Sequence, residues 1–215
     1  MPSRAVLFDF DGTLADTAPD LAAAVNRMRV EQGQAALPLE RLRPFASAGA
    51  RGLVHAAFGI KPGDPDYDAL RETFLEYYAE RVCAETRLFP GIADLIGELR
   101  RRGIAWGIVT NKATRFTERI VAKLRLDPDC VSCGDSTAHL KPHPAPLLHA
   151  AQQIQIPPED CFYLGDDLRD MKAAQAAGMR PIAVEWGYHH PESGGPASWQ
   201  AAAIIRHPLE LIEHL

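Results

Sequence analysis

Short apolar runs recur along the chain, separated by longer stretches of mixed polarity. The clearest of them hold only four to seven residues and are bounded by polar turns. Runs of this kind are typical of strands that are buried on both faces of a parallel sheet. We therefore predict strands at Arg4–Phe10, Ile104–Thr110, Cys161–Leu164 and Arg180–Trp186, and a weaker strand at Ala203–Ile205.

The stretches between these runs carry apolar residues at three-to-four spacing, which predicts helices. Gly103 and Gly178 stand just before two of the predicted strands, where a glycine commonly ends a helix. Strands that alternate with helices through short links predict an α/β fold with a doubly wound parallel sheet. The predicted helices cover Ile92–Arg102, Arg115–Leu124, Ala145–Ile154 and Leu168–Ala177.

One region, from Thr17 to about Arg87, breaks the alternation because it holds helical patterns and no convincing strand. We predict that residues 17–87 form a helical cap domain inserted into a core domain of residues 1–16 and 88–215. Its hinges are expected near Asp16–Thr17 and near Leu88–Gly91. The helices are predicted at Asp20–Gln32, Arg51–Phe58 and Tyr67–Val82, with loops at 37–50 and 61–67.

Composition and charge narrow the classes of function. The 215-residue chain is 47% hydrophobic and carries a net charge of -5, which argues against a nucleic acid or an anionic membrane as the main partner. No stretch approaches the roughly 20 apolar residues that span a bilayer, and the N-terminal apolar run is too short for a signal peptide. We expect a cytoplasmic protein, and we assign no role to the Cys130–Cys133 pair because no second pair accompanies it.

Acidic residues stand at the end of the first predicted strand and just after it. In an extended chain, alternation would send Asp9 and Asp11 to the same side. Two crowded carboxylates repel unless a cation neutralises them, so the pair suits a hard metal ion such as Mg²⁺. Gly12 permits a turn that a side chain would obstruct. The alternative is a solvated turn with a chance acidic pair.

The later strand ends carry further polar groups. Thr110 and Asn111 offer a hydroxyl and an amide to an anionic oxygen, although Thr-Asn-Lys is also an ordinary helix-capping turn. Lys141 lies in a proline-restricted segment and could supply a fixed positive charge, or could be a surface lysine before a helix. Asp166, Asp167 and Asp170 follow the fourth run, where helix capping is the alternative to metal binding.

In chain order these motifs read DFDGT, TN, LKPHP and GDDLRD. Their order and content resemble the haloacid dehalogenase superfamily of phosphohydrolases, and the resemblance covers essentially the whole chain. It implies a phosphoric monoester hydrolase that uses Mg²⁺ and forms an aspartyl-phosphate intermediate. The second aspartate of DFDGT and the absence of a histidine early in the cap set the chain apart from the dehalogenases and from the sugar-phosphate mutases of this superfamily.

By this resemblance Asp9 is the nucleophile, and Asp11 is the general acid for the leaving alcohol and then the general base for water. Thr110 and Asn111 would hold the phosphoryl oxygens, and Lys141 would neutralise Asp9 and the phosphate together. Gly12 is expected beside the bound substrate.

The same resemblance implies a Mg²⁺ site. Asp9, Asp166 and the backbone carbonyl of Asp11 would ligate the ion. Asp170 would fix Lys141 or a metal-bound water, and Asp167 would support the groups that surround the metal ligands. Mg²⁺ and Lys141 together would lower the repulsion between the Asp9 carboxylate and the phosphate of the substrate, which must approach each other.

The substrate implied is a small phosphate ester that carries a carboxylate. The stretch DTAPDLAAAVN resembles phosphoglycolate phosphatases, whereas SAGARGL, VTNKATRF and GYHHP are similar to N-acetylmuramic acid 6-phosphate phosphatases. Arg51 is the candidate for the carboxylate contact, because a guanidinium forms a bidentate pair with that group, and Arg115 could also line the pocket. The alternatives are that Arg51 merely begins a helix and that Arg115 is solvated.

A rival from another class is a phospho-acceptor domain that signals by carrying phosphate on an aspartate. It too places acids, a hydroxyl and a lysine at strand ends. Its acidic pair precedes the phosphorylated aspartate, however, and it has no cap. The helical insert and the order of DFDGT therefore favour the enzyme.

Overall fold

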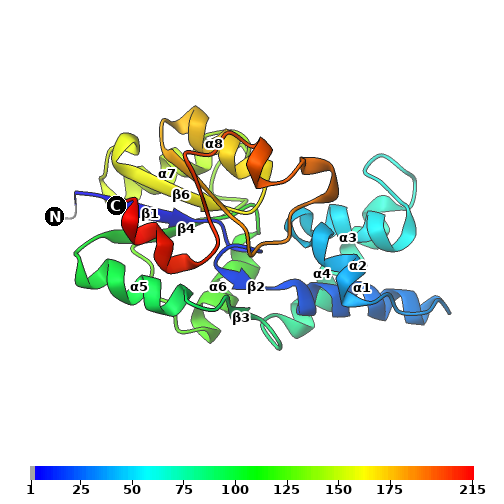
Figure 1. The fold of residues 1–215 in the computed structure, drawn as a ribbon. Helices are drawn as coiled ribbons and strands as arrows, with labels where there is room; N and C mark the ends of the chain where they lie inside the picture. The colour runs from blue at the N-terminus through cyan, green and yellow to red at the C-terminus, as the bar shows by residue number, and fades with distance from the viewer. Residues whose placement is uncertain (1–2) are drawn as a thin grey trace.

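The computed structural model describes residues 3–215, and its centre is a six-stranded sheet with the order β5-β4-β1-β6-β7-β8. Every neighbouring pair in this sheet is parallel, so the predicted doubly wound α/β fold is confirmed (Figure 1). The strands are β1 (Ala5–Phe8), β4 (Ala105–Val109), β5 (Cys130–Ser132), β6 (Cys161–Gly165), β7 (Arg180–Val184) and β8 (Ala203–Ile205).

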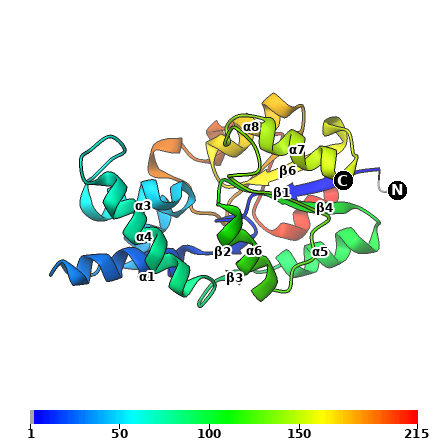
Figure 2. The same cartoon turned by 180° about the vertical axis from the view of Figure 1, so that it is seen from behind.

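Alternation along the central strand divides the core into two layers. Ala5 and Leu7 belong to the apolar cluster that contains α7 (Ala145–Ile154) and α8 (Leu168–Ala177). Val6 and Phe8 belong to the cluster that contains α5 (Ile92–Arg101) and α6 (Thr114–Lys123). All four residues are fully buried, as expected of a strand covered on both faces. Helices α7 and α8 therefore cover one face of the sheet, and α5 and α6 cover the other (Figure 2).

Strand β5 was not predicted. Its three residues pair with the edge of β4, where Gly107 lies opposite Cys130. A Cβ atom at Gly107 would stand 2.3 Å from the Cys130 sulfur, so the Cys130 side chain fills the space that a side chain at position 107 would need. A run of three residues between two turns is too short to show a hydrophobic period, which is why the sequence pattern missed it.

Between β1 and β4 the chain forms a separate group of helices at one end of the sheet (Figure 1). They are α1 (Ala18–Glu31), α2 (Leu39–Leu42), α3 (Gly49–Phe58) and α4 (Tyr67–Arg81). The predicted loop at 37–50 is wrong, because α2 and a 3₁₀ helix at Arg43–Ala48 occupy most of it. Buried residues of these helices continue the apolar cluster of one sheet face, so the group is packed against the core.

Two links join the helical group to the sheet, and they run side by side. Strand β2 (Ala15–Asp16) pairs antiparallel with β3 (Arg87–Leu88). The buried hydroxyl of Tyr188 accepts hydrogen bonds from the backbone N–H groups of Thr17 and Ala18 at 2.7 and 2.9 Å, and donates to Asp16 at 2.9 Å. The pair lies at the predicted hinges, and the division into core and cap domains stays a prediction.

None of the four cysteines forms a disulfide bond. All four cysteines are free and buried, and burial raises the pKa of the Cys130 thiol to about 12. Such a thiol remains protonated and unreactive near neutral pH. Over residues 3–215, none of the helices is both long and apolar enough to pass through a bilayer.

Candidate active site

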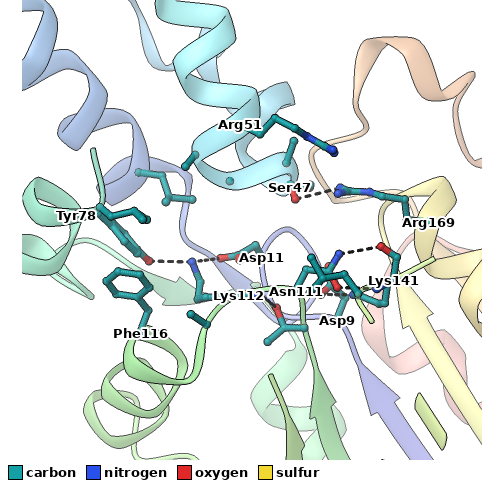
Figure 3. Close-up of a pocket in the computed structure, with 18 of the residues that line it drawn as sticks. Asp9, Asp11, Ser47, Arg51, Tyr78, Asn111, Lys112, Phe116, Lys141 and Arg169 are labelled. Atoms are coloured by element: carbon teal, nitrogen blue, oxygen red, sulfur yellow. Dashed lines mark hydrogen bonds and ion pairs between the residues drawn. The ribbon is translucent and has the colours of Figure 1, made fainter. Parts of the chain in front are cut away.

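The candidate site lies where the carboxyl ends of three adjacent strands meet. Asp9 follows β1, Thr110 follows β4 and Asp166 follows β6, and β1 lies between the other two strands in the sheet. Functional groups gather at this edge of an open parallel sheet because the strands all end there. The structure therefore brings together three of the predicted residues from distant parts of the chain, and Figure 3 shows one of them, Asp9, beside Lys141.

Lys141 is the hub of the site. Its ammonium group donates to Asp9 Oδ1 and Asp170 Oδ1, both at 2.7 Å, and to the hydroxyl of Tyr163 at 2.8 Å. The side chain is only 4% exposed. Burial lowers the pKa of Lys141, but the charges of Asp170 and Asp9 outweigh burial and raise it, so the amine stays charged. Tyr163 was not predicted, because its position inside a buried strand resembles that of any core aromatic.

Three carboxylates crowd around this lysine. Oxygen atoms of Asp9, Asp166 and Asp170 lie within 4.8 Å of one another. Burial raises the pKa of Asp9 to about 7, with Lys141 opposing the shift and Asp170 adding to it. Burial, Asp9 and Asp170 raise the pKa of Asp166 well above its ordinary value. A single lysine does not neutralise the cluster, and its hard oxygen donors fit a divalent cation such as Mg²⁺.

Asp166 is held by hydrogen bonds from several elements. Its carboxylate accepts from Thr13 Oγ1 at 3.0 Å, from Ser47 Oγ at 3.1 Å and from the backbone N–H of Tyr188 at 2.8 Å. Gly12 has a φ of 91°, and a Cβ atom there would stand 2.2 Å from Asp166 Oδ2. Gly12 is therefore required for the close approach of Asp166, and its predicted contact with substrate stays a prediction.

Asp11 lines the same cavity as Asp9, but a turn positions it and not strand alternation, because β1 ends at Phe8. The side chain of Asp11 accepts a hydrogen bond from Thr17 and forms an ion pair of 3.1 Å with Lys112. Lys112 in turn donates to the hydroxyl of Tyr78 on α4 at 3.1 Å. Lys112 was missed because the sequence reads there as an ordinary capping turn.

Asn111 and Thr110 hold the backbone around the site. The amide of Asn111 accepts from the backbone N–H of Lys141 at 2.9 Å and donates to its carbonyl at 3.0 Å. Thr110 Oγ1 accepts from the backbone N–H of Lys112 at 3.1 Å. Both residues line the cavity, so contacts with a phosphoryl group remain predictions, whereas the clamp on Lys141 is a function of Asn111 that was not predicted.

The GDDLRD segment forms the helix cap that its sequence allowed and also contacts Lys141, whereas metal binding by its acids stays a prediction. Asp167 caps α8 by accepting from the backbone N–H of Arg169 at 2.9 Å, and Asp170 Oδ2 accepts from the backbone N–H of Asp167 at 3.1 Å. Asp170 Oδ1 meanwhile binds Lys141. Helix capping therefore orients Asp170 toward the lysine, and one arrangement serves both purposes.

A cavity of about 430 Å³ opens above these groups, between the sheet edge and the inserted helices. Three arginines at its rim, Arg51, Arg71 and Arg115, have no carboxylate partner among residues 3–215. Apolar side chains form much of the wall on the opposite side from Arg51, including Tyr78 and Phe116 (Figure 3). The cavity thus offers spare positive charge beside an apolar surface.

The model of the haloacid dehalogenase-like hydrolase family matches residues 6–184. The chain belongs to this family. The match confirms the resemblance that the four motifs indicated.

Individual relatives of this haloacid dehalogenase-like hydrolase align along nearly its whole length. An N-acetylmuramic acid 6-phosphate phosphatase of Pseudomonas aeruginosa is 42% identical over 100% of this chain and 96% of its own. A phosphoglycolate phosphatase of Xanthomonas campestris is 41% identical over 98% and 95%. The crystal structure of CbbY from Rhodobacter sphaeroides in complex with phosphate has a TM-score of 0.75 and 28% identity, covering 98% of this chain and 96% of that one.

Proposed function

We propose that this haloacid dehalogenase-like hydrolase cleaves small carboxylate-bearing phosphate monoesters through an aspartyl-phosphate on Asp9. The observation that carries the proposal is the buried contact of Asp9 with Lys141, 2.7 Å long, beside Asp166 and Asp170. A nucleophilic carboxylate needs positive charge around it when it meets a phosphate dianion. Lys141 supplies one fixed positive charge, and the cluster of carboxylates suits a divalent metal ion as the second.

The reaction uses the residues in two steps. Asp9 attacks phosphorus, the bond from phosphorus to the alcohol oxygen breaks, and Asp11 gives that oxygen its proton. Water then attacks the aspartyl-phosphate, Asp11 takes a proton from the water, and inorganic phosphate leaves a free Asp9 carboxylate. Lys112 holds Asp11 at 3.1 Å and would have to release it for both transfers.

Asp9, Asp166 and the backbone carbonyl of Asp11 would hold Mg²⁺. When bound, the ion would neutralise charge on the phosphoryl group and on the crowded carboxylates. Lys141 keeps the second position next to Asp9, and Asp170 fixes the lysine there at 2.7 Å. The protein therefore presents the nucleophile between a fixed ammonium group and the metal ligands.

The charge of the cavity supports a substrate with a carboxylate. Lys112 and Lys141 are already committed to the carboxylates of Asp11, Asp9 and Asp170 through ion pairs of 2.7 to 3.1 Å. The rim arginines, which have no such partner, are left to receive an additional anionic group of the substrate. Guanidinium groups bind carboxylates in bidentate geometry, which gives specificity as well as energy.

Two substrates match the relatives: phosphoglycolate and N-acetylmuramic acid 6-phosphate. Both carry a carboxylate, so charge does not separate them. The cavity of about 430 Å³ falls in the range of roughly 300 to 1,000 Å³ that drug-sized ligands occupy. A two-carbon ester would fill little of that space, and the volume favours the sugar-sized acid.

Phosphate release tests the proposal. We expect multiple turnovers with Mg²⁺ on at least one of these two esters, at a higher kcat/KM than on glucose 6-phosphate. Asp9→Asn should abolish turnover, and Arg51→Ala should weaken the preference over glucose 6-phosphate. Stoichiometric phosphorylation without turnover would support the phospho-acceptor instead, and an unchanged preference in Arg51→Ala would remove the role of Arg51.

We also propose a cytoplasmic setting. All four cysteines are free thiols, and free thiols persist in a reducing compartment. Fractionation of cells that make the protein, with detection by antibody, would test the location. Recovery from an oxidising compartment would contradict it.

A further inference from the structure

One side chain of the core reaches across to the inserted helices. Arg169, in the first turn of α8, forms a bidentate ion pair with Asp167, with distances of 2.8 and 3.0 Å. The same guanidinium donates to the backbone carbonyl of Ser47 at 3.1 Å. Figure 3 shows Arg169 extended toward Ser47, with Arg51 above them.

Ser47 is held at a second atom as well. Its hydroxyl donates to Asp166 Oδ2 at 3.1 Å. Ser47, a residue of the inserted segment, is therefore bound twice. Its carbonyl contacts Arg169 and its hydroxyl contacts Asp166. Two hydrogen bonds at one residue fix both its position and its orientation.

The position of Ser47 determines where Arg51 lies. Ser47 belongs to the 3₁₀ helix Arg43–Ala48, which leads directly into α3, and Arg51 lies in the first turn of α3. These two helices pack tightly, because a Cβ atom at Gly52 would stand 2.4 Å from the backbone oxygen of Phe45. They therefore move as one unit, and a shift of Ser47 would carry Arg51 with it.

The charges separate the functions of the two arginines. Asp167 neutralises Arg169 through both arms of the guanidinium, and Arg169 itself lowers the pKa of Asp167 against the effect of burial. Arg51 has no carboxylate partner among residues 3–215, although it lines the same cavity. Arg51 is thus available to an anionic ligand, whereas Arg169 is committed to holding the protein together.

We propose that Arg169 and Ser47 form a clasp between the core and the inserted helices, and that this clasp positions Arg51 against the carboxylate of the substrate. Arg169 is a positioning residue in this arrangement and acts through Arg51. The inference rests on the proposed function. It adds that the contact between Arg169 and Ser47 determines the preference for carboxylate-bearing esters.

The experiment measures the preference as a ratio. It divides kcat/KM on the better of phosphoglycolate and N-acetylmuramic acid 6-phosphate by kcat/KM on p-nitrophenyl phosphate, which has no carboxylate. The variants are Arg51→Ala, Arg169→Met and their double mutant. Arg206→Met is the matched control, because Arg206 also forms an ion pair, with Glu185, but lies outside the cavity.

We expect Arg51→Ala to lower the ratio roughly 10- to 100-fold, which corresponds to the loss of a charged hydrogen bond. Arg169→Met should lower it by a similar factor, mainly through KM of the carboxylate ester. The double mutant should fall no further than the single mutants, because both remove one contact. The control should keep the ratio of the wild type.

An unchanged ratio in Arg169→Met would overturn the clasp, as would a double mutant whose losses multiply, since multiplication would mean that each arginine binds separately. If Arg169→Met does not fold by circular dichroism, Arg169→Lys answers the same question, because lysine cannot hold Asp167 bidentately and Ser47 at once. A wild type that turns over no ester with Mg²⁺ would instead refute the proposed function.

Discussion

Asp9→Asn should produce an inactive protein that is more stable than the wild type. Burial and neighbouring carboxylates hold the pKa of Asp9 at about 7, against an ordinary 3.8. The unfolded chain releases this proton near pH 4, but the folded protein keeps it until about pH 7. In that window the free energy of unfolding falls as pH rises, by up to ~4 kcal/mol for a difference of about three pH units. Asparagine cannot ionise and escapes this loss.

The remaining contacts of the site support this expectation. In Asp9→Asn the ammonium of Lys141 keeps Asp170 at 2.7 Å and Tyr163 at 2.8 Å, so the lysine is not left alone. We therefore expect the metal-free variant to melt up to roughly 10 °C above the wild type at pH 8. Near pH 4 the two proteins should melt together. Adding Mg²⁺ should narrow the gap at pH 8, because the ion offsets more carboxylate charge in the wild type than in the variant.

Thermal melts in EDTA from pH 4 to pH 8, with and without added Mg²⁺, measure the effect. Asp135→Asn is the matched control, because hydrogen bonds from Thr114 lower the pKa of Asp135. That substitution should destabilise the protein slightly at pH 8, with the opposite sign. A stability gap for Asp9→Asn that does not change with pH, or a variant less stable than the wild type at pH 8, would refute the reasoning.

Three further outcomes follow from the same geometry. Lys141→Met should abolish phosphate release and lower the free energy of unfolding in urea by about 3 kcal/mol, because it leaves Asp170 and its neighbours without their buried cation; an unchanged unfolding midpoint would contradict this. Tyr188→Phe should cost about 2 kcal/mol in the same assay, since two backbone N–H groups and Asp16 lose a partner, and a value near zero would show that the hydroxyl is dispensable. Chelation by EDTA should stop turnover and Mg²⁺ should restore it, so undiminished hydrolysis after chelation would exclude the metal site.

The sequence predicted those strands and site residues whose signal lies within a few neighbouring residues. Buried runs predicted β1, β4, β6 and β7, because a strand covered on both faces is apolar along most of its length. The edge strand β8 is only partly buried and gave the weaker signal. The acids after β1 and β6 were singled out because charge directly after a buried strand needs an explanation, whereas Lys141 was singled out by the prolines near it. The family assignment that they supported is confirmed.

The rest of the site depends on contacts between distant residues. Lys112, Tyr163 and Arg169 each have an ordinary local setting: a capping turn, a core strand and a first helical turn. Only folding brings Arg169 to Ser47, 122 positions away, and Tyr163 to Lys141. The 3₁₀ helix that contains Ser47 was likewise predicted as loop, because its conformation comes from packing against α3 more than from its own periodicity.

The pairing of β2 with β3 has a consequence for how such an enzyme changes over evolutionary time. The inserted helices leave and rejoin the rest of the chain through neighbouring backbones, where Ala15 lies opposite Leu88 and Asp16 opposite Arg87. A segment with adjacent ends can lengthen, shorten or be exchanged as a cassette without displacing the strands on either side of it. The chemistry of phosphate release and the choice of substrate are therefore able to diverge separately, the one preserved while the other is replaced.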